Sequence, residues 1–303
     1  MLLFFEQALN GVQFGMTLFL MASGLTLVFG IMRLINLAHG SLFMAGAYVA
    51  ASVNLASGSF ALAMLAGTLA AALLGALLES GVMRRLYDRE HLDQVLATFA
   101  IILISNELVR MLFGRQPLAI DVPSALAGSV ELIPGAPYPL YRLVIIGIGL
   151  AVMVGLYALV MRTRLGMWMR AAADNAEMIA LLGVNTRLLS LGVFALGAAL
   201  AGLAGGLAAP FLAIQAGMGE HILILTFVVV VIGGLGSIKG AALGALLVGL
   251  TDTLGRAYLP DLLRLVLPPA DADATGGALA SMAIYIVMAF VLIVRPHGLF
   301  GRA

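Results

Sequence analysis

The sequence predicts an all-α polytopic membrane protein, a bundle of eight or nine transmembrane segments in which one or two helices are broken. The 303-residue chain is 62% hydrophobic and only 10% charged, whereas soluble domains hold roughly 25% charged residues. Long stretches carry no formal charge, namely those between Glu6 and Arg33, over 34–78 apart from the titratable His39, and over 188–219. A soluble helix would show a polar face at every turn, and these stretches do not.

Each uncharged stretch is long enough for at least one crossing, because roughly 20 apolar residues span the hydrocarbon core. The expected crossings are Ala8–Ile31, Leu37–Ala56, Phe60–Met83, Gln94–Phe113, Tyr141–Met161, Leu189–Leu212, His221–Gly233, Ala241–Leu254 and Ala278–Val294. The seventh and eighth are too short to span alone, so they are either two half-helices that meet at a glycine-rich break or one interrupted span. The number of crossings, and with it the side of the N-terminus, stays open between eight and nine.

Basic residues indicate the orientation, since the cytoplasmic loops of membrane proteins are enriched in arginine and lysine. They gather in two loops and in the C-terminal tail: Arg84, Arg85 and Arg89; Arg162, Arg164, Arg170 and Arg187; Arg295 and Arg302. With nine crossings, this bias places both loops and the C-terminus in the cytoplasm. We therefore predict a single transmembrane domain over residues 1–303, with a cytoplasmic loop at 162–187.

The sequence argues against an enzyme. The run 233–240 is no phosphate loop, because Lys239 is followed by Gly240 rather than by Ser or Thr. No His-Glu-x-x-His zinc motif and no Gly-x-Ser-x-Gly elbow occur, and the lack of cysteine removes thiolate chemistry. A net charge of +1 gives no indication of nucleic-acid binding. We expect no catalytic residue, no metal site and no cofactor in this chain.

Two interruptions of the apolar pattern look alike, at residues 30–40 and 233–240. Each ends in glycine and then resumes an apolar helix, and paired breaks of this kind indicate a substrate site in transporters built from repeats. Free N–H groups of an unwound backbone would suit a substrate carboxylate. The candidate path residues are Asn36, His39, Gly40, Gly234, Gly236 and Ser237. In the simpler interpretation, Asn36 and His39 merely cap the second helix.

The loop 162–187 contains a segment that favours a short helix. Asp174 is expected to cap it, the helix to run through Leu182, and Gly183 to stop it. Met178, Leu181 and Leu182 would then form an apolar stripe with no membrane to bury it, which indicates a protein partner. The alternative is a helix that lies flat on the membrane or on its own bundle.

An ion-coupled carrier would need acidic residues within the membrane, and Glu79 and Glu107 are the candidates. Glu79 lies about one turn from Arg84, which favours a helix end near the cytoplasmic interface. Glu107 and Arg110 are three residues apart, which favours a structural ion pair on one helix face. A self-contained carrier or channel therefore stays an alternative, with few acidic residues within the membrane to support it.

Several segments together resemble the membrane permeases of branched-chain amino acid ABC transporters. The segment Gly24–Tyr48, especially Asn36-Leu-Ala-His-Gly40, resembles the family's N-terminal signature, and Ala176–Asn185, which ends in Leu-Leu-Gly-Val-Asn, resembles its ATPase-contacting loop. Gly233–Gly244 is similar to the late glycine-rich segment of these permeases, and Arg295–Gly301 to their C-terminal tail.

The resemblance implies a subunit of an ATP-driven importer for branched-chain amino acids in the bacterial inner membrane. Its partners would be a sister permease subunit, two cytoplasmic ATPase subunits that bind the ATP, a periplasmic substrate-binding protein and membrane lipid. The segment that includes Asp174, Glu177 and Gly183 would contact an ATPase. It departs from the Glu-Ala-Ala pattern of ABC importers, because Glu177 is followed by Met178 and Ile179. Related permeases carry urea, short amides or sugars, so these substrates stay open.

Overall fold

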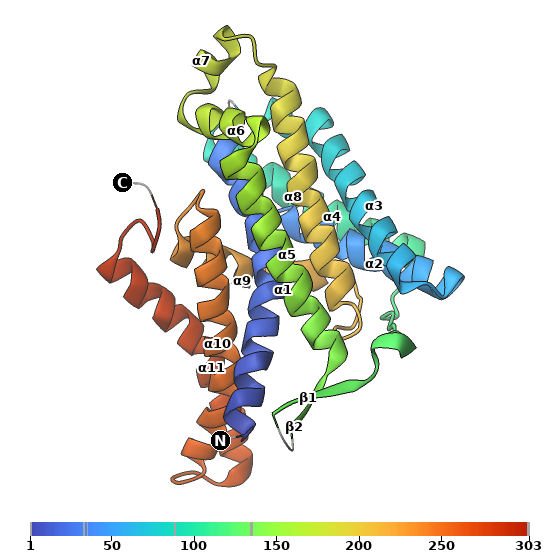
Figure 1. The fold of residues 1–303 in the computed structure, drawn as a ribbon, viewed down its shortest axis with the longest axis vertical. Helices are drawn as coiled ribbons and strands as arrows, with labels where there is room; N and C mark the ends of the chain where they lie inside the picture. The colour runs from blue at the N-terminus through green and yellow to red at the C-terminus, as the bar shows by residue number, and fades with distance from the viewer. Residues whose placement is uncertain (1, 33, 35, 88, 134–135, 302–303) are drawn as a thin grey trace. The chain divides into compact units, whose positions relative to one another are not determined.

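The computed structural model describes the chain except residues 1, 33, 35, 88, 134–135 and 302–303. Its α-helices are α1 (Leu2–Met32), α2 (His39–Ser57), α3 (Phe60–Gly81), α4 (His91–Phe113), α5 (Leu140–Arg162), α6 (Arg164–Asp174), α7 (Ala176–Leu181), α8 (Thr186–Ala208), α9 (Met218–Gly233), α10 (Ile238–Leu263) and α11 (Pro269–Val294) (Figure 1). Two 3-10 turns, η1 (Met83–Arg85) and η2 (Ser124–Leu126), complete the helical part. An all-α polytopic fold is confirmed.

Eight helices in the described part are long and apolar enough to cross a membrane, namely α1, α2, α3 together with η1, α4, α5, α8, α10 and α11. The ninth predicted crossing corresponds to the shorter apolar helix α9, of 16 residues. The choice between eight and nine crossings therefore depends on α9 alone.

The expectation that the crossing at 241–254 is too short is wrong, because α10 has 26 residues and a length of about 39 Å. The apolar pattern fades where charged residues enter the helix. Asp252 and Arg256 lie one turn apart, and the Arg256 Nε donates to the Asp252 carboxylate at 2.8 Å. This pairing lets the helix continue past both charges.

A short hairpin was not expected from the proline-rich stretch before α5. Strands β1 (Ser129–Ile133) and β2 (Ala136–Pro139) pair antiparallel, with Val130 opposite Tyr138. The Tyr138 hydroxyl donates to the Asn10 side chain of α1 at 3.1 Å, which ties the hairpin to that helix. Two of the prolines lie in β2, which is an edge strand where the missing N–H is tolerated.

The chain divides into two compact units. One comprises Met1–Phe19, Val122–Ala151 and Leu225–Ala303, and the other Leu20–Asp121 and Val152–Ile224. We name them the first and the second unit. Three of the four divisions fall inside α1, α5 and α9, and the fourth lies between Asp121 and Val122, before η2. The organisation as a single domain stays a prediction.

Glycines explain how the helices pack within each unit. In the second unit, α2, α3 and α8 pack closely: a side chain at Gly46 would overlap the backbone of Gly202, and one at Gly67 would press on the Gly46 carbonyl. In the first unit, Gly15 of α1 lies against the α10 backbone at Ala245. Small residues at such contacts are what membrane helices use to approach each other.

Candidate functional site: a broken helix, a closed pocket and an exposed helix

The first interruption separates α1 from α2, and it leaves a polar side chain buried without partners. Asn36 is fully buried, and neither atom of its side-chain amide has a hydrogen-bond partner among the described residues. A buried amide without partners costs about 1–3 kcal/mol. Such a cost needs an explanation, and a role toward a ligand is one that fits a transport path.

The interpretation in which Asn36 and His39 cap α2 through their side chains is wrong. The residue at the N-cap position is Ala38, and no side chain caps the helix. The His39 ring reaches α1 instead, where its Nε2 lies 3.2 Å from the Met21 carbonyl oxygen. His39 therefore fixes the start of α2 against α1, and the Asn36 amide takes part in neither the cap nor this contact.

Gly40 lies in direct backbone contact with Gly219 at the start of α9. A Cβ on either glycine would overlap the backbone of the other, so any side chain at these positions would push α2 and α9 apart. A small pocket opens beside this contact, lined by Leu37, Gly40, Ser41, Met44, Ile102, Asn106, Gly219, Glu220 and Leu223. It is too narrow to admit a water molecule. We call it the closed pocket.

Asn106 of α4 closes one side of this pocket, and sequence reasoning missed it. Its Nδ2 donates to the Glu220 carboxylate at 2.6 Å, and its Oδ1 accepts from the Gly217 N–H at 3.1 Å. Both partners lie more than 100 positions along the chain, which no local pattern reveals. The one available signal was an amide beside Glu107, after a long apolar run in the helix.

The second interruption has ordinary structural explanations. Gly234 and Gly236 have φ values of +96° and +80°, where glycine is favoured, and Ser237 caps α10 by accepting from the Gly240 N–H at 3.1 Å. The C-terminal tail packs here, since Leu299 and Phe300 donate their N–H groups to the carbonyls at the end of α9. These three candidate residues belong to the first unit, whereas Asn36, His39 and Gly40 belong to the second.

The predicted short helix in the loop 162–187 exists as α7, but its cap is Asn175 rather than Asp174. Helix α6 runs through Asp174, so the first residue with extended backbone is Asn175, whose side chain accepts from the Met178 N–H at 2.9 Å. The stop at Gly183 is confirmed by its φ of +86°. The Gly183 and Val184 N–H groups bond back to the carbonyls of the last turn, which is the Schellman arrangement.

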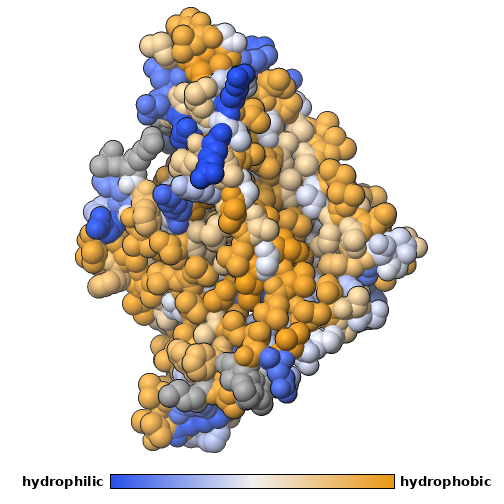
Figure 2. Space-filling view, viewed as in Figure 1, coloured by the Kyte–Doolittle hydropathy of each residue, from blue (hydrophilic) through white to orange (hydrophobic). Residues whose placement is uncertain are grey.

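Helix α7 presents the expected apolar stripe. Leu181 is 80% exposed, Leu182 76% and Met178 57%, whereas Ile179 is buried. Glu177 lies in the first turn, where the helix dipole favours a negative charge. Figure 2 shows hydrophobic surface at this tip, next to hydrophilic residues. A well-capped short helix with exposed leucines is suited to binding another protein.

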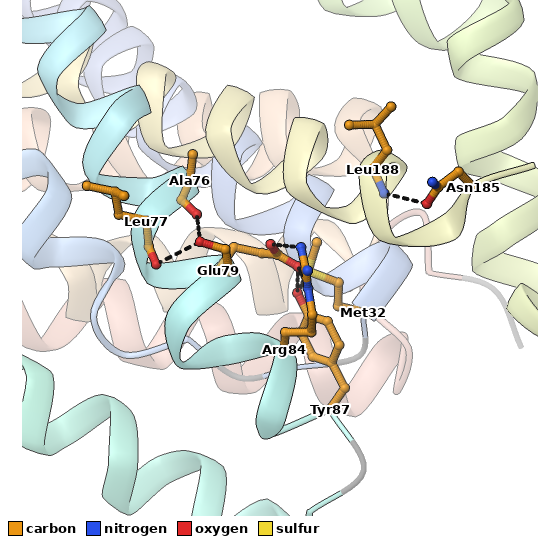
Figure 3. A network of polar contacts seen from close by, with 9 residues as sticks. Met32, Ala76, Leu77, Glu79, Arg84, Tyr87, Asn185 and Leu188 are labelled. Carbon is orange, nitrogen blue, oxygen red and sulfur yellow. Dashed lines mark hydrogen bonds and ion pairs between the residues drawn. The ribbon is translucent and has the colours of Figure 1, made fainter.

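Glu79 belongs to a buried ionic cluster rather than to a proton path. Its carboxylate is fully buried and accepts from the Arg84 guanidinium at 2.8 and 3.3 Å. The Tyr87 hydroxyl adds a hydrogen bond at 3.1 Å and also lies 3.3 Å from the Met32 sulfur (Figure 3). Burial, and next the charge of Glu79, raise the pKa of Tyr87. The cluster ties the end of α1 to the end of α3.

The expected ion pair between Glu107 and Arg110 is present, with 3.3 Å between the charged atoms. Elsewhere in the described part of the chain, no group of three or more histidine or acidic side chains is placed to hold a metal ion.

The comparisons with known proteins agree with this arrangement. The family described as branched-chain amino acid transport system / permease component matches residues 7–293. The chain belongs to this family. It is a transport subunit of the membrane, and its family is not a family of enzymes.

Curated relatives match the permease over nearly the whole of both chains. It is 30% identical to the high-affinity branched-chain amino acid transport system permease protein BraD of Pseudomonas aeruginosa, over 99% of this chain and 96% of that one. It is 31% identical to the permease protein LivH of Salmonella typhimurium and 30% identical to LivH of Escherichia coli K12, with the same coverage. No solved structure matches it.

Proposed function

We propose that this permease is the membrane subunit of an ATP-driven importer for branched-chain amino acids in the bacterial inner membrane. The observation that carries the proposal is α7, a capped helix whose leucines are exposed. Its partners are a sister permease, two cytoplasmic ATPases that bind the ATP, a periplasmic substrate-binding protein and membrane lipid. The substrate class is that of the relatives.

In this proposal α7 is the contact to an ATPase. Asp174, Glu177, Met178, Leu181, Leu182 and Gly183 form the contact segment, with the leucines as the apolar anchor. The N-cap at Asn175 and the Schellman stop hold α7 as a rigid body, so closure of the ATPases displaces it as a unit. The loop and the C-terminus lie in the cytoplasm, as the distribution of arginine indicates.

The substrate path in this proposal follows the two interruptions. Asn36 is the strongest candidate, because its buried amide has no partner among the described residues. His39 and Gly40 hold the adjacent start of α2 in place. Gly234, Gly236 and Ser237 form the second break.

The test is co-purification of the solubilised permease with an ATPase from its host. We expect Leu181→Asp/Leu182→Asp to lose the ATPase and to keep expression and folding. A matched control is Leu265→Asp/Val266→Asp, since these residues are 80% and 84% exposed after α10 and lie outside the contact segment. This control is expected to retain the ATPase.

A wild-type permease that retains no ATPase and transports when reconstituted alone would contradict the proposal. Such a result would favour a self-contained carrier, and stopping uptake by dissipating the ion gradient would identify it. ATP-dependent uptake of urea, an amide or a sugar, with no uptake of leucine, would support an ATP-driven importer and contradict branched-chain amino acids as its substrates.

A further inference from the structure

A second, open hollow includes Glu107, the neighbour of Asn106 in the chain. It is lined by Glu107, Arg110, Gly114, Arg115, Gln215 and Ala216, and its volume is about 460 Å³. Small-molecule sites usually occupy roughly 300–1,000 Å³. All of its lining residues belong to the second unit. In size, the hollow suits a free amino acid.

The hollow carries charges of both signs, and their ion pair can give way to pairs with a ligand. Glu107 is 64% exposed and Arg110 50%, and exposed ion pairs of this kind contribute little to stability. Arg115 adds a second guanidinium, and Gln215 an amide. A carboxylate ligand gains paired hydrogen bonds from arginine, while an ammonium group gains the Glu107 carboxylate. The lining therefore complements a molecule that carries both groups.

The two walls of the hollow are held together at both ends. On one side, Leu118 and Ile214 exchange two backbone hydrogen bonds of 2.9 Å each. On the other side, Asn106 binds Gly217 and Glu220. This bracing fixes the distance between the end of α4 and the segment before α9, so a ligand meets preformed walls.

Along α4, the lining of the closed pocket ends at Asn106 and that of the hollow begins at Glu107. Both hydrogen bonds of the Asn106 amide cross to the segment that starts α9. The closed pocket is lined in part by apolar side chains, of Leu37, Met44, Ile102 and Leu223. The linings of a polar hollow and of a partly apolar pocket thus meet at this point of α4.

We propose that the hollow binds the ammonium and carboxylate groups of a free α-amino acid. The aliphatic side chain of this amino acid then enters the closed pocket when the hydrogen bonds of Asn106 open. This inference rests on the proposed function, because it takes the substrate to be an amino acid. Glu107 receives the ammonium group, and Arg110 and Arg115 receive the carboxylate. Binding here is weak, since the site is open to water.

The absence of native cysteines permits a direct test. Ala216→Cys places a single thiol in the lining, and a water-soluble maleimide labels it in proteoliposomes that hold the permease with its partner subunits. The probes are L-leucine, 4-methylpentanoate, which lacks the ammonium group, and 3-methylbutylamine, which lacks the carboxylate. We expect leucine to slow labelling several-fold, and each single-charge analogue to slow it much less.

Substitutions in the same Ala216→Cys background identify the contacts. Glu107→Gln and Arg115→Gln are each expected to abolish the protection by leucine. The matched control is Asp261→Asn, because Asp261 and Arg264 form another exposed pair three residues apart, at 2.9 Å, that does not line the hollow. In this control the protection is expected to persist.

The outcomes separate this inference from the proposed function. ATP-dependent leucine uptake without any protection of the introduced thiol would overturn amino-acid binding in the hollow, and it would support the proposed importer. Equal protection by leucine and by a single-charge analogue also overturns it. Protection by leucine that disappears with Glu107→Gln supports the hollow, even where the same vesicles show uptake without ATP and so refute the importer.

Discussion

Asn106 and Glu220 lie 114 positions apart in the chain, and their side chains meet at 2.6 Å beside the closed pocket. The same amide also accepts from the Gly217 backbone, so both of its functional groups are used. An amide that satisfies a carboxylate and a backbone N–H at once connects α4 to the start of α9.

Asn106→Ala is expected to destabilise the permease by about 1–3 kcal/mol, because it leaves the Gly217 N–H and the Glu220 carboxylate without their partner. The measurement is the midpoint of thermal unfolding in detergent. Asp261→Asn, at an exposed pair, should change the stability by less than about 1 kcal/mol. Equal midpoints for the two variants would show that the connection carries no stability.

Gly40→Ala is expected to lower the yield of monodisperse permease, because the added Cβ overlaps the Gly219 carbonyl. Gly155→Ala is the matched control, since a Cβ there meets nothing within 4 Å. Within a helix, that control should even gain stability, by up to about 1 kcal/mol. Size-exclusion profiles and unfolding midpoints check both variants. Wild-type behaviour of Gly40→Ala would rule out the tight contact.

Glu79→Gln is expected to cost about 1–3 kcal/mol, since it removes the charge that the Arg84 guanidinium pairs with. The loss should stay below the roughly 3–5 kcal/mol of a fully buried pair, because Arg84 is 36% exposed. In a double-mutant cycle, Arg84→Gln should cost less in the Glu79→Gln background than in the wild type. Additive losses would mean that the two residues do not interact.

The stability should fall at alkaline pH, in part through Tyr87. Burial and Glu79 raise the pKa of Tyr87 in the folded state, so the unfolded chain releases this proton first, near pH 10. The folded state then holds more protons than the unfolded one, and the free energy of unfolding decreases as the pH rises above about 10. Tyr87→Phe should make this decrease shallower. An unchanged slope in the variant would count against the raised pKa.

The sequence was informative wherever one property recurs over many residues. Runs without charge located most of the membrane helices, and the positions of Glu107 and Arg110 predicted their ion pair, because neighbours on a helix face follow from its period. The stop at Gly183 followed from a local backbone requirement. The length of α10 was misjudged, because a charge such as Asp252 looks like a helix boundary until its partner Arg256 is seen beside it.

Features that depend on tertiary contacts were beyond reach. Asp174 and Asn175 are adjacent and both suit an N-cap, and only the extent of α6 decides between them. A capping role for His39 was the alternative to a place on the substrate path, and its ring instead reaches the Met21 carbonyl of the preceding helix. Asn106 was missed, because its partners, Gly217 and Glu220, lie more than 100 positions away in the sequence. Each of these features needed the packing of helices to be known.

The contact between Gly40 and Gly219 has a consequence for how the permease would move. Two backbones touch at this joint with no side chain between them, so no rotamer at either glycine has to change when they part. Speed of opening at this joint would then depend on the few hydrogen bonds beside it, chiefly those of Asn106.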